Sequence, residues 1–378
     1  MRTRITFALI ASLALAAQTP PASAGPAVKW RGAVWASGAA SDRQTPDGAL
    51  FLRTVDAGGG QLSLDGLQVG ADVTLPDGFG LKFTILGGQT GKFLNAITAV
   101  SGTTPAETGS LAWPEAMVTW SGGNETLKFG RMYTAIGMEV LDATLNVPAT
   151  RGILFTYAIP CAQVGLNWHH AFSGSWSSDV WVFNGEDRVQ DNNRGKTAGV
   201  GLTYNHGGAA DRFATLMAFS GAEQDGLGAA AVRGAEGRKR TRVSFAGQWV
   251  WGATTLQWEA ENGREDLPSG DKASWTGFGA ICKYPFNDRW SAYGRLETLR
   301  DDTGIRLGAD ATVARAIALD PSANLTAHSG SLGVERRWHA TFTRLEVRRD
   351  SLNRDVKDRD GKIFRDATSL TWSLGTSF

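Results

Sequence analysis

Long runs in which every second residue is apolar recur along this chain. Examples are residues 79–85, 197–204, 242–251 and 290–297, where aliphatic and aromatic side chains alternate with polar residues or glycine. A period of two is typical of β-strands. The runs extend over about 9 to 12 residues, which exceeds the usual strand of a soluble sandwich and suits a tilted strand that crosses a bilayer.

The composition fits strands with two different faces. Mean hydropathy is only −0.19, although the chain contains 14 tryptophans and 17 phenylalanines. After the N-terminus there is no apolar run of about 18 residues, the length of a membrane-spanning helix. The 38 basic and 37 acidic side chains nearly balance, which argues against a nucleic-acid-binding protein with its basic excess. We therefore predict an all-β fold in which strands face lipid on one side and water on the other.

The segments that join these strands alternate between short and long. The short joins lie at residues 76–78, 121–124, 169–175, 206–208, 251–253, 285–288 and 336–337, and the long joins near 37–60, 90–109, 132–151, 184–196, 220–240, 261–273, 299–322 and 349–366. This alternation is typical of a transmembrane antiparallel up-and-down β-barrel with short periplasmic turns and long extracellular loops. We predict about 16 strands, within a range of about 14 to 18, and both termini on the periplasmic side.

The first 24 residues are predicted to be a cleaved signal peptide. A basic start at residues 2–4 precedes an apolar run at 5–17, and Ala-Ser-Ala at 22–24 provides a small-residue cleavage site. Residues 25–378 then form a single β-barrel domain of the outer membrane.

The exported chain contains two cysteines, Cys161 and Cys282. A disulfide is permitted in an oxidising compartment, but two cysteines do not make a disulfide framework. We interpret them as ordinary strand residues and keep a bridge as the alternative.

Tryptophans cluster beside the joins predicted to be short. They are Trp120, Trp168, Trp176, Trp249, Trp251, Trp290 and Trp338. An indole ring prefers the boundary between hydrocarbon and water, so this clustering predicts an aromatic girdle on the periplasmic side.

The chain ends on an amphipathic strand rather than a polar tail. Trp372, Leu374 and Phe378 share one face of this strand. The arrangement resembles the C-terminal signal that outer-membrane barrels present to their assembly machinery. Pairing of this strand with residues 28–35 would close the barrel and leave no open edge.

The stretch from Lys128 to Tyr204 resembles the signature region of the OmpL-like putative β-barrel porin family. The matching residues are Phe129-Gly130-Arg131, Gly137-Met138-Glu139, Asn146, Arg151-Gly152, Pro160, Asn184-Gly185, Asp191-Asn192-Asn193 and Lys196-Thr197. At Glu186-Asp187 the chain departs from the Trp-Asp expected after Asn-Gly in that family. The resemblance implies a porin in the outer membrane of a Gram-negative bacterium.

The third long loop is the predicted constriction. A barrel of about 16 strands leaves an aqueous lumen, and in porins of this size the third loop commonly folds into it. In loop 132–150 and at its ends, Glu139, Asp142, Arg131 and Arg151 would set a transverse field. The alternative is that these residues are salt-bridged anchors without influence on permeation.

Strand alternation supplies further pore-lining candidates. Charge on the lipid face would cost about 2 to 4 kcal/mol per Arg or Lys at mid-bilayer, so charged residues that alternate with apolar ones face the lumen. These candidates are Arg242, Gln257, Glu259, Arg295, Glu297, Arg344, Glu346 and Arg348. They carry both signs, which favours a general polar pore over a strongly ion-selective one.

One basic cluster falls in a predicted loop. Arg238-Lys239-Arg240 is predicted to be solvated at the extracellular mouth, with binding of lipopolysaccharide phosphates as the alternative.

Together these features predict a porin for passive diffusion of small hydrophilic solutes or ions. No cofactor, metal site or catalytic residue is expected. The expected partners are outer-membrane lipid, lipopolysaccharide, the barrel-assembly machinery and, by analogy with 16-stranded porins, other copies in a homotrimer, whereas nucleic acid is not expected.

Two other functions stay open as alternatives. One is a non-conducting barrel that acts as a scaffold, adhesion protein or tether. The other is a barrel lipid hydrolase, which is the least favoured because the chain has no Gly-x-Ser-x-Gly or His-Glu-x-x-His motif. His169, His170 and Ser173 also lack the two-residue spacing that would put a His and a Ser on one face of a strand.

Overall fold

A computed structural model describes residues 25–56, 59–98, 109–191, 193, 195–223, 238–267, 270–319 and 324–378. The predicted signal peptide at residues 1–24 lies outside the described residues. The strands are β1 Ala27–Ser41, β2 Gln61–Thr74, β3 Phe79–Gly87, β4 Ala112–Gly122, β5 Glu125–Tyr133, β6 Ala162–Ala171, β7 Trp176–Phe183, β8 Thr197–Asn205, β9 Phe213–Ala222, β10 Lys239–Trp251, β11 Thr254–Asp266, β12 Lys272–Pro285, β13 Trp290–Asp301, β14 Leu325–Trp338, β15 Thr341–Lys357 and β16 Ile363–Ser377. The helices are α1 Gln89–Thr98 and α2 Ala311–Leu319, and short helical turns occupy Pro76–Gly78, Leu154–Ala158, His206–Gly208 and Leu307–Ala309. Within the described ranges, no helix has the length and apolar character needed to span a membrane.

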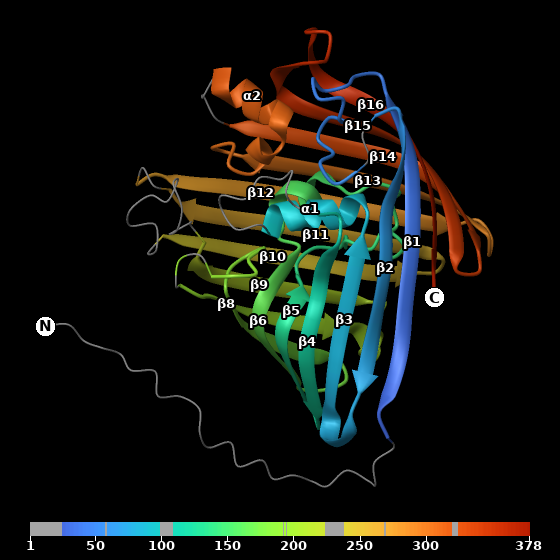
Figure 1. Cartoon of the computed structure of the whole chain (residues 1–378), viewed down its shortest axis with the longest axis vertical. Coiled ribbons are helices and arrows are strands. Elements are labelled where there is room, and N and C mark those ends of the chain that lie inside the picture. Colours follow the sequence, from blue (N-terminus) through green and yellow to red (C-terminus); the bar gives the residue numbers. More distant parts are fainter. Residues whose placement is uncertain are drawn as a thin grey trace, which may run out of the picture.

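The strands close into one antiparallel barrel. Each strand pairs with its neighbours in sequence, and β1 pairs with β16 from Ala33 opposite Ser377 to Ser41 opposite Ser369. Figure 1 shows the blue β1 beside the red β16 at this closure. The prediction of an all-β up-and-down barrel of about 16 strands is confirmed, and closure leaves neither terminal strand with an open edge.

The two ends of the barrel differ in the length of their joins. One end, called the turn end below, carries the joins at 75–78, 123–124, 172–175, 206–212, 252–253, 286–289 and 339–340. The other, called the loop end, carries the joins at 42–60, 88–111, 134–161, 184–196, 223–238, 267–271, 302–324 and 358–362. Most loop-end joins are longer than the turn-end joins, as predicted, but those at 267–271 and 358–362 are shorter than the turn-end join at 206–212.

Two loop-end joins and one turn-end join differ from the prediction because paired strands continue further than expected. Long joins were predicted at 261–273 and 349–366, but Arg264 still pairs with Ser274, and Val356 with Phe364. The predicted turn at 336–337 lies within β14, and the chain reverses only at residues 339–340.

The outer face of the barrel is apolar, as the alternation predicts. In β16, Leu370, Trp372 and Leu374 are exposed on the outside, whereas Ser369, Thr371 and Ser373 are buried inside. Of the predicted girdle tryptophans, all but Trp120 are exposed, and all lie near the turn end. The terminal Phe378 is exposed and its backbone pairs with Gly32 of β1.

At the loop end the interior is a hydrophobic core. Apolar side chains from four loops meet there, among them Phe51, Leu52, Leu94, Leu154, Phe155, Leu307 and Val313. They pack against inward-facing wall residues such as Trp181, Phe219 and Trp275. Burial of this apolar area stabilises the loops inside the barrel, since each fully buried large side chain contributes about 1.5 to 3 kcal/mol.

The two cysteines are not bridged. Cys161 is buried inside the barrel, just before β6 rather than within a strand as predicted. Cys282 lies in β12 and is exposed on the outer face. The wall of the barrel separates them, so the disulfide alternative is excluded.

Candidate functional site

Loop 134–161 crosses the interior from β5 and β6 to the far wall. Its backbone N–H groups donate to three carboxylates that project inward from β11, β13 and β15. Met138 N lies 2.7 Å from Glu259, Ala149 N lies 2.8 Å from Glu346, and the N atoms of Ile153 and Leu154 each lie 3.1 Å from Glu297. Carboxylates that accept backbone N–H groups make strong, charge-assisted hydrogen bonds, so the wall holds this loop at several points.

Arginines of the same wall hold the carbonyl oxygens of the loop. Arg295 donates to the carbonyl of Thr150 at 2.5 Å, and Arg348 to the carbonyl of Arg151 at 2.5 Å. Arg344 donates to the carbonyls of Ala143 at 3.0 Å and Pro148 at 3.2 Å. The wall therefore offers carboxylate acceptors to the N–H groups of the loop and arginine donors to its carbonyl groups.

The predicted pore-lining residues thus face inward as expected, but most lie beneath the loop. Arg242, Arg295, Arg344 and Arg348 are at most 2% exposed, and Glu346 is fully buried. Between Glu139 and Glu259 the free space is only about 10 Å³, room for about one water molecule. Gln257 is half-buried and donates to Gln248 at 2.8 Å. Most of the wall residues therefore anchor the loop rather than line an open pore.

Glu139 is a loop residue that contacts both an arginine of the wall and the backbone of its own loop. Its carboxylate lies 2.7 Å from Nη1 of Arg295 and accepts the N–H of Gly152 at 2.6 Å. Burial raises the pKa of Glu139 to about 7, even though the charge of Arg295 lowers it.

The other loop candidates have local roles. Asp142 accepts the N–H of Thr144 at 2.9 Å and the side chain of Gln68 at 3.3 Å. Arg151 is buried, donates to the carbonyl of Leu141 and lies 3.8 Å from Asp56 of loop 42–60. Both residues fold the loop onto its neighbours.

Arg131 differs from its prediction. It shares one side of β5 with Leu127 and Phe129, which are exposed on the outer face, and it donates to the hydroxyl of Thr98 in α1 at 3.4 Å. Because β5 continues to Tyr133, strand alternation still determines the direction of the Arg131 side chain. Arg131 is therefore not placed among the residues that face the loop from inside.

At Gly152 the loop backbone passes close to the wall. A Cβ atom at this position would lie 2.0 Å from Oε1 of Glu297, whose carboxylate is held by the next two backbone N–H groups. Only glycine lets the loop backbone reach that carboxylate.

A second buried ion network is centred on Glu186 in loop 184–196. Arg242 lies 2.8 Å from its carboxylate, Arg240 2.9 Å and Arg306 3.5 Å. Burial alone would raise the pKa of Glu186, but the three guanidinium groups outweigh it and hold this pKa well below its usual range. The prediction that Arg238-Lys239-Arg240 is a solvated loop is wrong for Arg240, because β10 begins at Lys239 and its alternation turns Arg240 into this network.

Asp187 links this network to the end of loop 134–161. Its carboxylate accepts the N–H groups of Cys161 at 2.7 Å and Ala162 at 3.0 Å. Glu186 stands where the resemblance predicted Trp, whereas Asp187 matches the Asp expected after it, and both residues anchor loops.

In the turn half of the interior, inward-facing basic side chains keep contact with solvent. Lys82 is 37% exposed and Arg31 26%, while their shared partner Glu115 is 4% exposed. Lys283 is 25% exposed and Arg337 37%, while their shared partner Glu335 is 2% exposed. Sequence reasoning missed these residues, although the alternation that placed Arg295 inside would also have placed Lys82 and Lys283 there. Arg337 was assigned to a turn.

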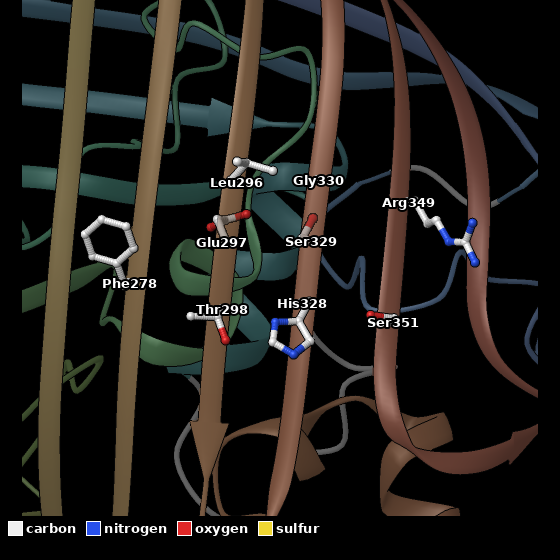
Figure 2. A pocket seen from close by; sticks show the side chains of 9 residues that line it. All are labelled: Phe278, Leu296, Glu297, Thr298, His328, Ser329, Gly330, Arg349 and Ser351. Atoms are coloured by element: carbon white, nitrogen blue, oxygen red, sulfur yellow. The ribbon is translucent and has the colours of Figure 1, made fainter.

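A hollow of about 440 Å³ lies on the outer wall over β12–β15. Figure 2 shows Phe278, Leu296, His328 and Arg349 around it on neighbouring strands. Phe278 and Leu296 are exposed on the face that alternation turns outward. This hollow therefore faces away from the lumen and does not belong to the pore.

The histidines of the hydrolase alternative lie within hydrogen-bond distance of carboxylates. His169 Nδ1 lies 3.2 Å from Asp179, and His170 Nδ1 lies 2.6 Å from Glu125. The hydroxyl of Ser173 accepts the N–H groups of Ser175 and Trp176 within a turn. In the part of the chain that the structure describes, no group of three or more His, Cys, Asp or Glu side chains is arranged to hold a metal ion.

Comparison with known proteins agrees with this geometry. A family model described as putative beta-barrel porin-2, OmpL-like, matches residues 28–378. The outer membrane channel DcaP of Acinetobacter baumannii has a TM-score of 0.61 at 12% identity, over 95% of this chain and 99% of that chain. OmpT of Vibrio cholerae in its trimer form has a TM-score of 0.60 at 10% identity, over 94% and 100%. Salmonella typhi OmpF in complex with daunomycin has a TM-score of 0.59 at 10% identity, over 93% and 97%. No curated protein matches the chain. At these identities the structural likeness shows the fold.

Proposed function

We propose, from the premise that the chain belongs to the OmpL-like putative β-barrel porin-2 family, that loop 134–161 narrows its pore. The protein is a porin of the Gram-negative outer membrane and forms a pore for passive diffusion of small hydrophilic solutes. We propose both the place at which the pore is narrowed and the contacts that hold the narrowing loop in position.

The observation that carries this proposal is the docking of the loop. A segment that starts between β5 and β6 is bonded to β11, β13 and β15 through carboxylates and arginines. Such a segment reduces the open cross-section of the barrel wherever it crosses. A loop whose backbone polar groups are satisfied by the wall is also held in one position, as a size-selective constriction requires.

We propose further that the protein assembles as a homotrimer. The support is the fold shared with OmpT, which has been solved in a trimer form.

Reconstitution in a planar bilayer tests the pore and the trimer together. We expect the current to rise in discrete steps and to depend linearly on voltage. Each inserted trimer should show three equal conductance levels, one for each pore. A single step per insertion would contradict the trimer. Insertion without conductance would contradict the pore and favour the scaffold or tether alternative.

The end of β16 is proposed to engage the assembly machinery, and the outer face to contact lipid and lipopolysaccharide. Deletion of Phe378 removes an exposed aromatic ring and the backbone pairing with Gly32 that extends the closure. We expect less folded protein in outer-membrane fractions, measured by heat-modifiable migration on gels. The matched control is Phe286→Ala, an exposed aromatic in a turn-end join. Equal folded yield of the deletion and the control would contradict this role.

We propose no catalytic activity. Purified protein should release no fatty acid from phospholipid vesicles, and release that stops in a His170→Ala variant would overturn this statement.

A further inference from the structure

We propose that Lys283 and Arg337 form an anion-binding subsite beside Glu335 in the turn half of the lumen, with Arg344 buried behind them, and that this subsite makes the pore prefer anions. This inference rests on the proposed pore and adds the class of solute. The residues come from β12, β14 and β15, three neighbouring strands of the barrel wall.

The geometry is a single carboxylate surrounded by three cations. Lys283 Nζ lies 2.8 Å from Glu335, Arg344 Nε 2.8 Å and Arg337 Nη2 3.1 Å. The ring of Phe342 supports the two guanidinium groups, with its centroid 3.9 Å from Arg344 and 5.5 Å from Arg337. Stacking on an aromatic face positions an arginine without neutralising its charge.

The charges of this cluster do not cancel. Three basic groups against one carboxylate leave a formal net charge of about +2. Glu335 is buried behind its partners, whereas the ends of Lys283 and Arg337 are exposed to the lumen. The surface that a passing ion meets is therefore positive, and the compensating negative charge is screened from it.

The charges on the β1–β4 wall and those beneath loop 134–161 do not offset this excess. On the wall formed by β1–β4, Arg31 and Lys82 are balanced by Asp72 and Glu115. Nearer the loop end of the same wall, Glu297 and Glu346 lie beneath loop 134–161 and accept its N–H groups. The uncompensated charge that faces solvent near β12–β15 is therefore positive.

The donors suit small oxyanions. A lysine ammonium and an arginine fork together offer several N–H groups to the oxygens of a phosphate or a carboxylate. A positive surface inside a narrow, low-dielectric passage raises the local concentration of such anions and of chloride.

Reversal potentials in a KCl gradient test the preference. The wild type is expected to favour chloride over potassium. In the double variant Lys283→Gln/Arg337→Gln, which brings the cluster to zero, the chloride-to-potassium permeability ratio should fall by at least about twofold. In Lys283→Glu/Arg337→Glu it should fall below one. The matched control is Arg349→Gln, which removes an exposed arginine from the outer face of β15 and should leave the ratio unchanged.

A titration without current separates this inference from the pore itself. Full-length protein in detergent is titrated with inorganic phosphate and, in a second arm, with acetate, which reports whether carboxylates bind as well. Saturable phosphate binding that is lost in Lys283→Gln/Arg337→Gln and kept in Arg349→Gln supports the subsite even if the bilayer is silent. The single variant Lys283→Gln serves the same purpose if the double variant does not fold. Equal binding in all variants, no saturable binding to the wild type, or a permeability ratio that the substitutions do not change would overturn it.

Discussion

Replacement of Arg295 by alanine should release loop 134–161 from the wall and increase the conductance of single channels. Arg295 donates to Thr150 and Glu139 of the loop and lies 3.2 Å from Glu297 and 3.8 Å from Glu346 on the wall. Without it, buried carboxylates lose their main counter-charge. Breaking a buried ion pair in this way costs about 3 to 5 kcal/mol, which shifts a docked-to-released equilibrium by roughly a hundredfold or more.

Two measurements check this expectation. Single-channel recordings should show larger and noisier steps, and amide hydrogen exchange in residues 134–161 should accelerate by roughly a hundredfold where local opening controls it. Arg300→Ala is the control on the same strand, because Arg300 faces outward and pairs with the exposed Asp302. Conductance and exchange equal to those of the control would mean that the wall does not hold the loop.

Replacement of Glu186 by alanine should have the second large effect, on the stability of the loop end. Three guanidinium groups share this carboxylate, and one of them, Arg242, is fully buried. Removal of the anion leaves these cations to repel one another in a largely buried site, in which Arg240 and Arg306 are only 15% and 16% exposed. We expect a loss of about 3 to 5 kcal/mol in local stability, seen as faster hydrogen exchange in loops 184–196 and 302–319.

The effect of Glu186 should depend on pH in a defined direction. Its pKa in the folded protein is lowered, so its contribution is complete above its ordinary value of 4.5 and is lost as pH falls toward the folded pKa. The difference between Glu186→Ala and wild type should thus be full at pH 7 and shrink below about pH 4.5. Asp366→Ala, which removes the exposed partner of Arg349, is the control and should change little at either pH. A difference that stays constant from pH 7 to pH 3 would show that Glu186 does not act through its charge.

Predictions that rested on strand alternation were accurate in direction. Arg295, Arg344 and Glu346 all face inward, and Leu370, Trp372 and Leu374 face outward. Side chains of a strand alternate strictly between faces, so the direction of one residue determines that of its neighbours. The same rule corrects the exceptions, because Arg131 and Arg337 lie in strands that extend further than their sequences indicated.

Predictions about the surroundings of those side chains were less accurate. Arg295 and Arg348 were expected to line an open pore. They instead hold the loop between β5 and β6, which is distant from both residues in the sequence. Arg240 was expected in solvent and is bound to Glu186, Glu223 and Glu265. These partners lie 54, 17 and 25 residues away along the chain, so no local pattern could have identified them.

The sequence by itself therefore determined the barrel, its approximate number of strands, the inward or outward direction of most strand residues and the end at which the loops lie. All of these follow from a period of two and from the spacing of turns, which are local properties. The tertiary structure alone decided which inward charges meet solvent and which are covered. That outcome depends on where residues 42–56, 134–161 and 302–318 pack inside the closed wall. In the loop half, ion pairs and apolar contacts between distant segments bury the charges, whereas in the turn half Lys283 and Arg337 remain open to the lumen.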